Sequence, residues 1–173
     1  LGKQGRTAWR LRRHYMRVFR PDDTMIIVER TDPHNPQATA LLQASHALMQ
    51  SLFPPEDNAY LSIDELCAED VHFFAARRGT VLRGTGALAV KNGYGEIKSM
   101  FVDPDARGQG VADAILRSLE DLTLEIGLLE MRLETGNKLH AAHRLYERHG
   151  FVICGPFGNY TANPSSIFMK KQL

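Results

Sequence analysis

The sequence has few of the features that mark membrane, disulfide-rich or repetitive proteins. Its only two cysteines, Cys67 and Cys154, lie far apart and form no CxxC pair. This spacing argues against a disulfide framework or a structural zinc site, and it fits a reducing compartment. No apolar run reaches the roughly 18 residues of a membrane helix. No stretch near the N-terminus resembles a signal peptide, and no internal repeat occurs. We therefore expect a cytoplasmic protein with no membrane partner.

Charge is uneven along the chain, although the net formal charge is only +1. Residues 1–24 hold seven basic and two acidic side chains, and residues 25–173 hold 14 basic and 18 acidic ones. A basic arm on a mildly acidic body could bind nucleic acid. However, a strand-like run begins at Met25 and suggests that the domain starts there. We expect a basic, loosely ordered or upstream-translated extension at 1–24, a domain at 25–173, and no nucleic-acid partner.

The pattern of apolar residues and turn signals predicts one α/β (α+β) domain. Asn35 and Pro36 are suited to cap and begin a helix that ends before Pro54. Ser62 and Glu65 are spaced as a capping box for a second, short helix. Longer helices are expected at 111–126 and 138–149. Strands are expected at 25–29, 71–76, 80–90, 94–102, 130–135, 151–154 and 166–170. This order favours a mixed sheet with helices on both faces.

The segment from Phe101 to Ala112 connects a strand to the clearest helix through a turn rich in Gly and Asp. Gly108 and Gly110 would let the backbone approach a ligand closely. The first N–H groups of the helix would point into the turn and favour an anion, such as a pyrophosphate. Tight packing without a ligand is the alternative. The turn has neither the Lys-Ser/Thr of a Walker loop nor a GxGxxG pattern.

Three motifs together resemble one family. Residues 107–112, Arg-Gly-Gln-Gly-Val-Ala, are similar to the (Gln/Arg)-x-x-Gly-x-(Gly/Ala) signature of the GNAT family of N-acetyltransferases. Residues 95–102 look like that family's fourth strand, and residues 142–151 are similar to its A-x-x-L-Y-x-x-x-G-F motif. The resemblance covers residues 25–173. It implies a mostly antiparallel sheet of six to seven strands with a splayed central pair, and acetyl-CoA as co-substrate.

The resemblance also implies which residues contact the cofactor. In the family, the turn binds the pyrophosphate of coenzyme A and the fourth strand lies beside its pantetheine arm. Many members carry an asparagine seven residues before the motif tyrosine, where this chain has Leu139, so the nearby Asn137 is a less direct match that could instead cap the helix. The cofactor-binding candidates are thus Met100, Phe101, Val102, Arg107, Gly108, Gln109, Gly110, Val111, Ala112 and Asn137.

Two residues are candidates for the chemistry. Tyr146, by resemblance, would protonate the departing thiolate, and its alternative role is aromatic packing. Glu96 lies eleven residues before Arg107, where several members carry a glutamate base. Strand alternation predicts Glu96, Lys98 and Met100 on one face. Glu96 could take a proton from the amine directly or through water, or it could simply pair with Lys98.

The sequence says least about the acceptor. By resemblance, the acceptor site would include Phe53, Tyr60, Phe157 and Tyr160, although aromatic residues equally suit ordinary packing. His140 and His143 lack acidic partners at metal spacing, so we expect no metal site. The predicted function is acetyl-CoA-dependent N-acetylation of a small-molecule primary amine by direct attack in a ternary complex. A non-catalytic acyl-CoA sensor is the alternative, and a homodimer is compatible with either.

Overall fold

A computed structural model describes residues 25–173, so the predicted extension at 1–24 lies outside the described residues. Seven strands form one sheet in the order β1-β2-β3-β4-β5-β7-β6. The strands are β1 (Ile26–Arg30), β2 (Val71–Arg78), β3 (Val81–Lys91), β4 (Tyr94–Val102), β5 (Glu130–Gly136), β6 (Val152–Cys154) and β7 (Ser166–Gln172). All neighbours run antiparallel except β4 and β5, which are parallel. The predicted mixed, mostly antiparallel sheet is confirmed.

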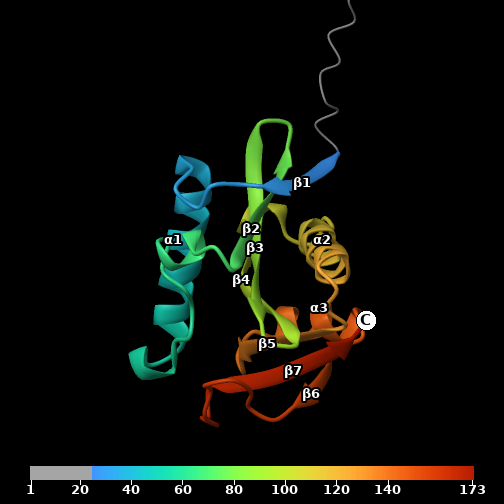
Figure 1. Ribbon diagram of the computed structural model, residues 1–173. Coiled ribbons are helices and arrows are strands. Elements are labelled where there is room, and N and C mark those ends of the chain that lie inside the picture. Colours follow the sequence, from blue (N-terminus) through green and yellow to red (C-terminus); the bar gives the residue numbers. More distant parts are fainter. Residues whose placement is uncertain (1–24) are drawn as a thin grey trace, which may run out of the picture.

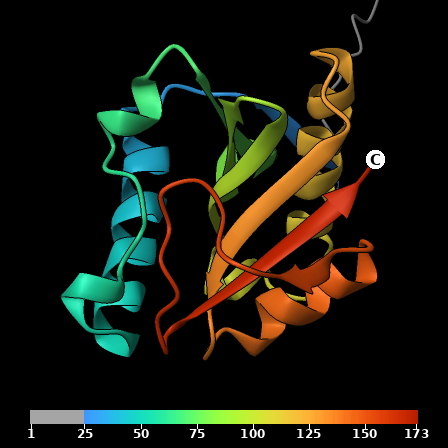
Figure 2. The same ribbon diagram turned by 60° about the horizontal axis from the view of Figure 1, so that its bottom comes forward.

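Helices cover both faces of this sheet (Figure 1). Helix α1 (Pro36–Leu52) packs on one face, and α2 (Val111–Glu125) and α3 (His140–Arg148) pack on the other. Each face has its own core, because Leu42 of α1 packs with Phe73 of β2, whereas Ile115 of α2 packs with Ile97 of β4 and Leu133 of β5. The loop between β6 and β7 turns back toward α1 on the α1 side (Figure 2).

Local sequence signals place the ends of these elements. The side chain of Asn35 accepts hydrogen bonds from the first turn of α1, which begins at Pro36 as expected. Ser62 and Glu65 form the predicted reciprocal capping box, but the helix that follows is a single 3-10 turn at Glu65–Cys67. Two further 3-10 turns lie at Pro55–Asp57 and Pro104–Ala106.

The parallel pair β4 and β5 is joined over only a short stretch. Residues 95–97 of β4 pair with residues 131–133 of β5, and the pairing stops at Ile97 and Leu133. Beyond this point the two strands separate, as the predicted splayed pair requires. The backbone edge of β4 from residue 98 onward is therefore available to a ligand.

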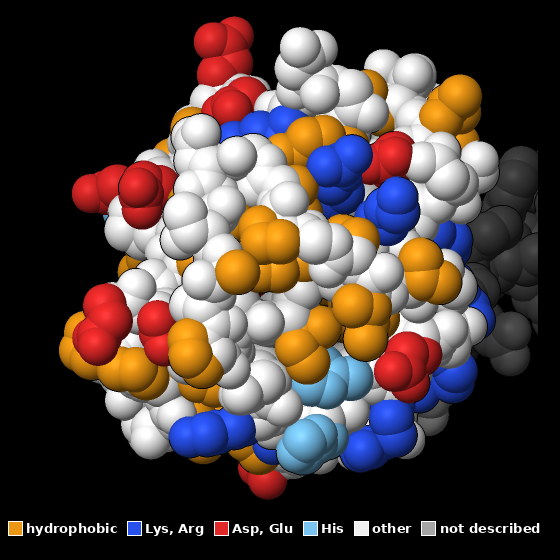
Figure 3. All heavy atoms as spheres, turned by 90° about the horizontal axis from the view of Figure 1, so that it is seen from below, with side chains coloured by type: hydrophobic (Ala, Val, Ile, Leu, Met, Phe, Trp, Pro, Cys, Tyr) orange, Lys and Arg blue, Asp and Glu red, His pale blue; other side chains and the backbone are white. Residues whose placement is uncertain are grey.

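Viewed from the end of the molecule where β6 and β7 lie, apolar side chains occupy the middle of the surface and most charged side chains lie toward its periphery (Figure 3). Val152 and Ile153 on the edge strand β6 are 58% and 71% exposed. Within residues 25–173, none of the helices is long and apolar enough to cross a membrane.

Candidate active site

A cavity of about 570 Å³ opens where β4 and β5 separate. Ser45, Leu48 and Met49 of α1 line it from one face of the sheet. The start of α2 and the α3 residues Leu145 and Tyr146 line it from the other face. The cavity thus passes through the sheet, and two molecules could meet inside it after entering from opposite faces.

The end of the cavity beside α2 is built to receive an anion. Gly108 and Gly110 have φ angles of 70° and 84°, which glycine adopts without the strain that other residues would incur. Gly110 is the N-cap of α2 and provides no side-chain hydrogen bond to its first turn. The first N–H groups of α2 are therefore free to bind an anion, and the helix dipole strengthens the attraction.

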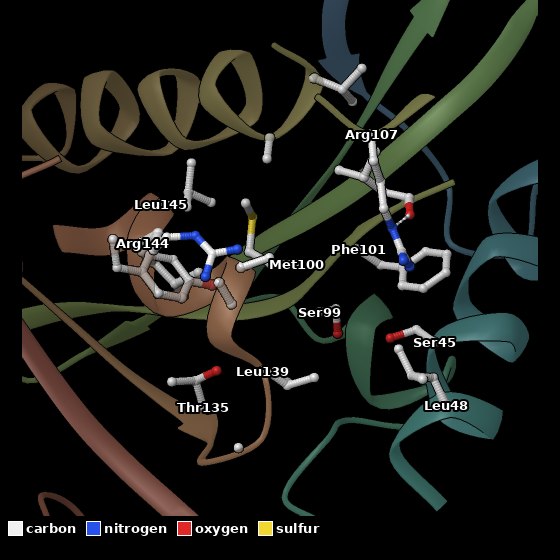
Figure 4. Close-up of a pocket in the computed structure, with 18 of the residues that line it drawn as sticks. Ser45, Leu48, Ser99, Met100, Phe101, Arg107, Thr135, Leu139, Arg144 and Leu145 are labelled. Atoms are coloured by element: carbon white, nitrogen blue, oxygen red, sulfur yellow. Dashed lines mark hydrogen bonds between the residues drawn. The ribbon is translucent and has the colours of Figure 1, made fainter. Parts of the chain in front are cut away.

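Two arginines add positive charge to this end of the cavity. Arg107 donates from Nε to the carbonyl oxygen of Val102 at 3.3 Å, and its guanidinium lies 6.0 Å from the centre of the Phe101 ring. Arg144 projects from α3 into the cavity on the side opposite Arg107 (Figure 4). We call this part of the cavity, with the start of α2, the phosphate end.

Gln109 differs from the other residues of the predicted turn. Its side-chain and main-chain oxygens both accept hydrogen bonds from the guanidinium of Arg78, and its Nε2 donates to the carbonyl oxygen of Asp105 at 3.0 Å. The side chain thus points away from the cavity, and its hydrogen bonds to Arg78 and Asp105 stabilise the conformation of the turn. Any contact between Gln109 and a bound anion would come from its backbone.

The predicted alternation of β4 side chains is wrong beyond Lys98. Ser99 has a φ of 53°, and Ser99 and Met100 together lie opposite the single residue Gly86 of β3. This β-bulge reverses the facing of the residues that follow. Met100 therefore packs toward α2 with Ile97, and it does not share a face with Glu96.

The remaining cofactor candidates divide between the cavity wall and its surroundings. Met100, Phe101 and Val102 line the cavity along the free edge of β4, where a pantetheine arm would fit. Asn137 lies outside it, because its side chain donates to the carbonyl oxygen of Pro164 at 2.8 Å. Asn137 does not cap α3 either, since the N-cap is Leu139, which lines the cavity instead.

Glu96 is buried in a polar network next to the cavity rather than on its wall. Tyr160 donates its hydroxyl proton to Glu96 Oε1 at 2.6 Å, and Lys98 Nζ lies 3.5 Å from the same oxygen. The sequence left an ion pair with Lys98 as the alternative for Glu96, and the structure contains that pair. The role of Glu96 as a base stays a prediction, and its carboxylate already has two partners.

Glu134 is a second carboxylate that the sequence analysis missed. It is the first residue of β5 beyond the last pair with β4, and it lines the cavity. Burial raises the pKa of Glu134, although Ser166 donates a hydrogen bond to it at 2.6 Å and Lys98 lies nearby. A buried carboxyl with a raised pKa is well matched to accepting a proton near neutral pH.

Tyr146 lines the same cavity from α3 and is 5% exposed. Its ring contacts Phe151 edge-on, with the ring centres 5.7 Å apart. Burial first, and then the nearby charge of Glu134, raise the pKa of Tyr146 well above its ordinary value. The phenol therefore keeps its proton across the neutral range and can donate it.

Of the four predicted acceptor residues, the structure places Tyr60 on the cavity wall. Phe53 is 5% exposed and packs against Gly136, where any side chain would collide with its ring. Phe157 is also 5% exposed and lies edge-on to Tyr160 and Phe168. Phe157 and Tyr160 thus support the wall from behind, with Tyr160 holding Glu96.

Replacing Phe53 by alanine should therefore affect folding rather than acceptor binding. The variant removes a buried ring between α1 and β5, and we expect the free energy of unfolding to fall by about 3 kcal/mol. Urea denaturation measures this loss. The KM for the acceptor should stay near its wild-type value, and a raised acceptor KM at unchanged stability would show that Phe53 contacts the acceptor.

Comparison with known proteins agrees with this geometry. The model of the Acetyltransferase (GNAT) family matches residues 38–151. The chain is 36% identical over 150 residues to a protein of Azospirillum brasilense named IAA acetyltransferase, covering 86% of this chain and 98% of the relative. It is 34% identical over 152 residues to the uncharacterized N-acetyltransferase YedL of Escherichia coli (strain K12), covering 86% of this chain and 96% of the relative.

Solved structures share the fold. A Klebsiella pneumoniae protein assigned to the acyl-CoA N-acyltransferases superposes with a TM-score of 0.73 at 31% identity, covering 87% of this chain and 99% of that one. PaiA N-acetyltransferase from Thermoplasma acidophilum, solved in complex with coenzyme A, superposes with a TM-score of 0.67 at 15% identity, covering 86% and 99%. At that identity, the second likeness concerns the fold alone.

Proposed function

Because this chain belongs to the GNAT family of acetyl-CoA-dependent acyltransferases, we propose that it acetylates the primary amine of a small molecule by direct attack in a ternary complex. The observation that carries the proposal is the cavity that passes through the sheet between β4 and β5. Acetyl-CoA would enter beside α2, and the amine would approach from the α1 side.

The residues present fit acetyl-CoA. The glycine turn and the start of α2 match a pyrophosphate, and Arg107 and Arg144 supply positive charge around it. The free edge of β4 from residue 98 to residue 102 matches the amides of the pantetheine arm. Acetyl-CoA supplies the thioester, and the chain supplies its position and the proton transfers.

The proton transfers require a base on the amine side and an acid on the thiolate side. We propose Glu134 as the base that accepts the proton of the attacking amine, since it lines the cavity and Glu96 does not. As the carbon–sulfur bond breaks, the Tyr146 hydroxyl would give its proton to the departing thiolate. Backbone N–H groups on the free edge of β4 would stabilise the developing oxyanion. Glu96 would act through a water or by holding Lys98 and Tyr160.

Binding of acetyl-CoA tests the first half of the proposal, with a glycine pair as its control. At one hundred times the dissociation constant, acetyl-CoA should stabilise the protein by about 2.7 kcal/mol and raise its melting temperature. Gly110→Ala, at a φ of 84°, should lose this shift. Gly127→Ala should keep it, because Gly127 has a matching φ of 82° but lies at the far end of α2. Equal shifts in both variants would place the cofactor elsewhere.

A turnover assay tests the proposed acetyl transfer to an amine, and it distinguishes an enzyme from a non-catalytic acyl-CoA sensor. Release of free thiol from acetyl-CoA is followed with a panel of primary amines. We expect amine-dependent thiol release for at least one class of amine. Stabilisation by acetyl-CoA without thiol release across the panel would favour the acyl-CoA sensor instead.

A further inference from the structure

A hydrogen bond from the neighbouring strand β7 reaches Glu134, the carboxylate proposed as the base. Ser166 donates its hydroxyl proton to Glu134 Oε1 at 2.6 Å. In the pairing of β5 with β7, Glu134 lies opposite Phe168, so Ser166 is its diagonal neighbour on the same face of the sheet. Glu134 lines the cavity, and Ser166 does not. Ser166 can therefore act on a molecule in the cavity only through Glu134.

Asn163, in the loop that precedes β7, fixes the direction of this hydrogen bond. The N–H group of Ser165 donates to Asn163 Oδ1 at 2.9 Å, so the amide nitrogen of Asn163 is the group that faces Ser166. Asn163 Nδ2 donates to Ser166 Oγ at 3.0 Å. An amide nitrogen can only donate, so the hydroxyl oxygen of Ser166 accepts this bond and its single proton goes to Glu134. Glu134 Oε1 is therefore the acceptor at the end of the chain.

This one-way chain of hydrogen bonds favours the ionised form of Glu134. A carboxylate oxygen accepts the Ser166 proton, whereas a carboxyl group protonated at Oε1 would lose that hydrogen bond. Within residues 25–173, Ser166 is the only hydrogen-bond donor to the Glu134 side chain. The chain thus occupies one carboxylate oxygen and leaves the other, Oε2, without a donor from the described part of the protein.

Charged and titratable groups from the other elements around Glu134 act on it at longer range. Burial raises the pKa of Glu134 most strongly, the donated hydrogen bond lowers it, and Lys98 and Glu96 of β4 then lower and raise it in turn. Tyr146 of α3 and Tyr160 of the β6–β7 loop are uncharged phenols at neutral pH, since burial raises the pKa of each. The donated hydrogen bond can therefore be removed while all four of these groups stay in place.

From these contacts we infer that Ser166 is a positioning residue for the proposed acetyl transfer, which holds Glu134 by one oxygen and leaves Oε2 to accept the proton of the attacking amine. This inference rests on the proposed function, and it adds the side chain on which the base depends. Without the Ser166 hydroxyl, the carboxyl group would be free to turn and would take up a proton more readily. The base would then be lost first at the acid side of the pH range.

Ser166→Ala tests the inference through the pH profile of kcat/KM, measured with one amine throughout so that the pKa of the amine is common to all variants. We expect the acid fall of kcat/KM to move to higher pH by about one unit, because losing a hydrogen bond to the charged form raises the pKa of the carboxyl. Ser165→Ala is the matched control, since the Ser165 hydroxyl donates to Asp57 Oδ2 at 2.5 Å, outside the cavity lining. It should leave the fall at its wild-type pH, and so should Ser166→Thr, which keeps a hydroxyl.

Asn163→Asp tests the direction of the chain without replacing Ser166 or Glu134. The new carboxylate would still accept the N–H bond of Ser165, but it would also accept the Ser166 proton in place of Glu134. Its negative charge acts in the same sense, because it favours the protonated form of Glu134. The acid fall should therefore move to higher pH, as in Ser166→Ala. An unmoved fall would overturn the role of Asn163 in orienting the hydroxyl.

NMR titration of the Glu134 carboxyl carbon repeats the comparison without turnover, so the two proposals can fail separately. A carboxyl pKa that is unmoved in Ser166→Ala, or that moves equally in Ser165→Ala, would overturn the inference. Amine-dependent thiol release by the wild type would then leave the proposed function standing. If the pKa rose in Ser166→Ala but no amine gave thiol release, the proposed function would be wrong, and with it the role of Ser166 in acetyl transfer.

Discussion

Replacing Glu134 by glutamine should lower kcat/KM at least about hundredfold, which is the usual contribution of a positioned general base. The substitution keeps the shape of the side chain and its contact with Ser166, and it removes the group that accepts the proton. Acetyl-CoA should still stabilise the variant, since the glycine turn and the start of α2 that would hold its pyrophosphate are unchanged. Steady-state kinetics with the best amine of the panel measure the loss.

The matched control is Glu96→Gln, which alters the other carboxylate of the same region. Glutamine can still accept the hydrogen bond of Tyr160, but it leaves the buried Lys98 without its counter-charge. We expect the free energy of unfolding to fall by about 2 kcal/mol, with a much smaller loss of kcat/KM than in Glu134→Gln. If Glu96→Gln lost activity and Glu134→Gln kept it, the base would be Glu96, as the sequence predicted.

The dependence of kcat/KM on pH tests the same assignment without relying on a single substitution. The base works only as a carboxylate, so activity must fall as the pH drops through its pKa. Because burial raises the pKa of Glu134, this fall should occur above the pH range of an ordinary glutamate. In Glu134→Gln the fall should disappear. A fall that persists unchanged in the variant would belong to another group.

Much of the fold could be predicted because its signals are local. Asn35 and Pro36 fix the start of α1 by their own geometry, and Gly108 and Gly110 mark the turn whose φ angles require glycine. Asn92 and Gly93 mark the hairpin between β3 and β4, and Gly93 has a φ of 90° as such turns demand. Signals of this kind depend on neighbouring residues alone, so they can be read without knowing the sheet.

The bulge in β4 could not be predicted in the same way. The residues of β4 alternate regularly in the sequence, and Ser99 has no feature that requires a φ of 53°. The bulge is set by the register between β3 and β4, where Thr85 donates a hydrogen bond to the carbonyl oxygen of Ser99 at 2.9 Å. Because this register is a tertiary property, the facing of Met100 was predicted wrongly.

Glu134 was missed for a related reason. Glu130, Arg132 and Glu134 alternate with apolar residues, so the sequence places all three on the polar face of β5. Glu130 is paired with Arg132, which leaves Glu134 beyond the last pair of β5 with β4. Only the point at which the strands separate distinguishes it. A signal in the sequence that could have indicated Glu134 is its position near the end of β5, three residues before the turn at Asn137 and Lys138.

For the predicted acceptor residues, the sequence could not distinguish aromatic side chains that line the cavity from those that pack in the core. Phe53 and Phe157 fill space behind the wall, whereas Tyr60 forms the wall itself. All three are aromatic residues next to turns, and their sequence context does not separate packing from lining. The difference lies in which helix and which loop reach the gap between β4 and β5.

Replacing Tyr146 by phenylalanine tests the acid directly, and we expect kcat to fall by about a hundredfold. The variant keeps the ring and its contact with Phe151, so the fold and the shape of the cavity should persist. Acetyl-CoA binding, measured by the thermal shift, should stay near the wild-type value because only one hydroxyl is lost. Tyr94→Phe, which removes a hydroxyl from a tyrosine outside the cavity lining, is the control and should retain full turnover.

The pH profile of Tyr146→Phe adds a second readout. Burial and the charge of Glu134 raise the pKa of Tyr146 well above its ordinary value, so the phenol stays protonated through neutral and mildly alkaline pH. The wild type should therefore show no alkaline loss of kcat from this group. In the variant the thiolate must take its proton from water, so kcat should be low at every pH in this range. Unchanged turnover in Tyr146→Phe would mean that the thiolate leaves without an acid, and that Tyr146 serves only to pack against Phe151.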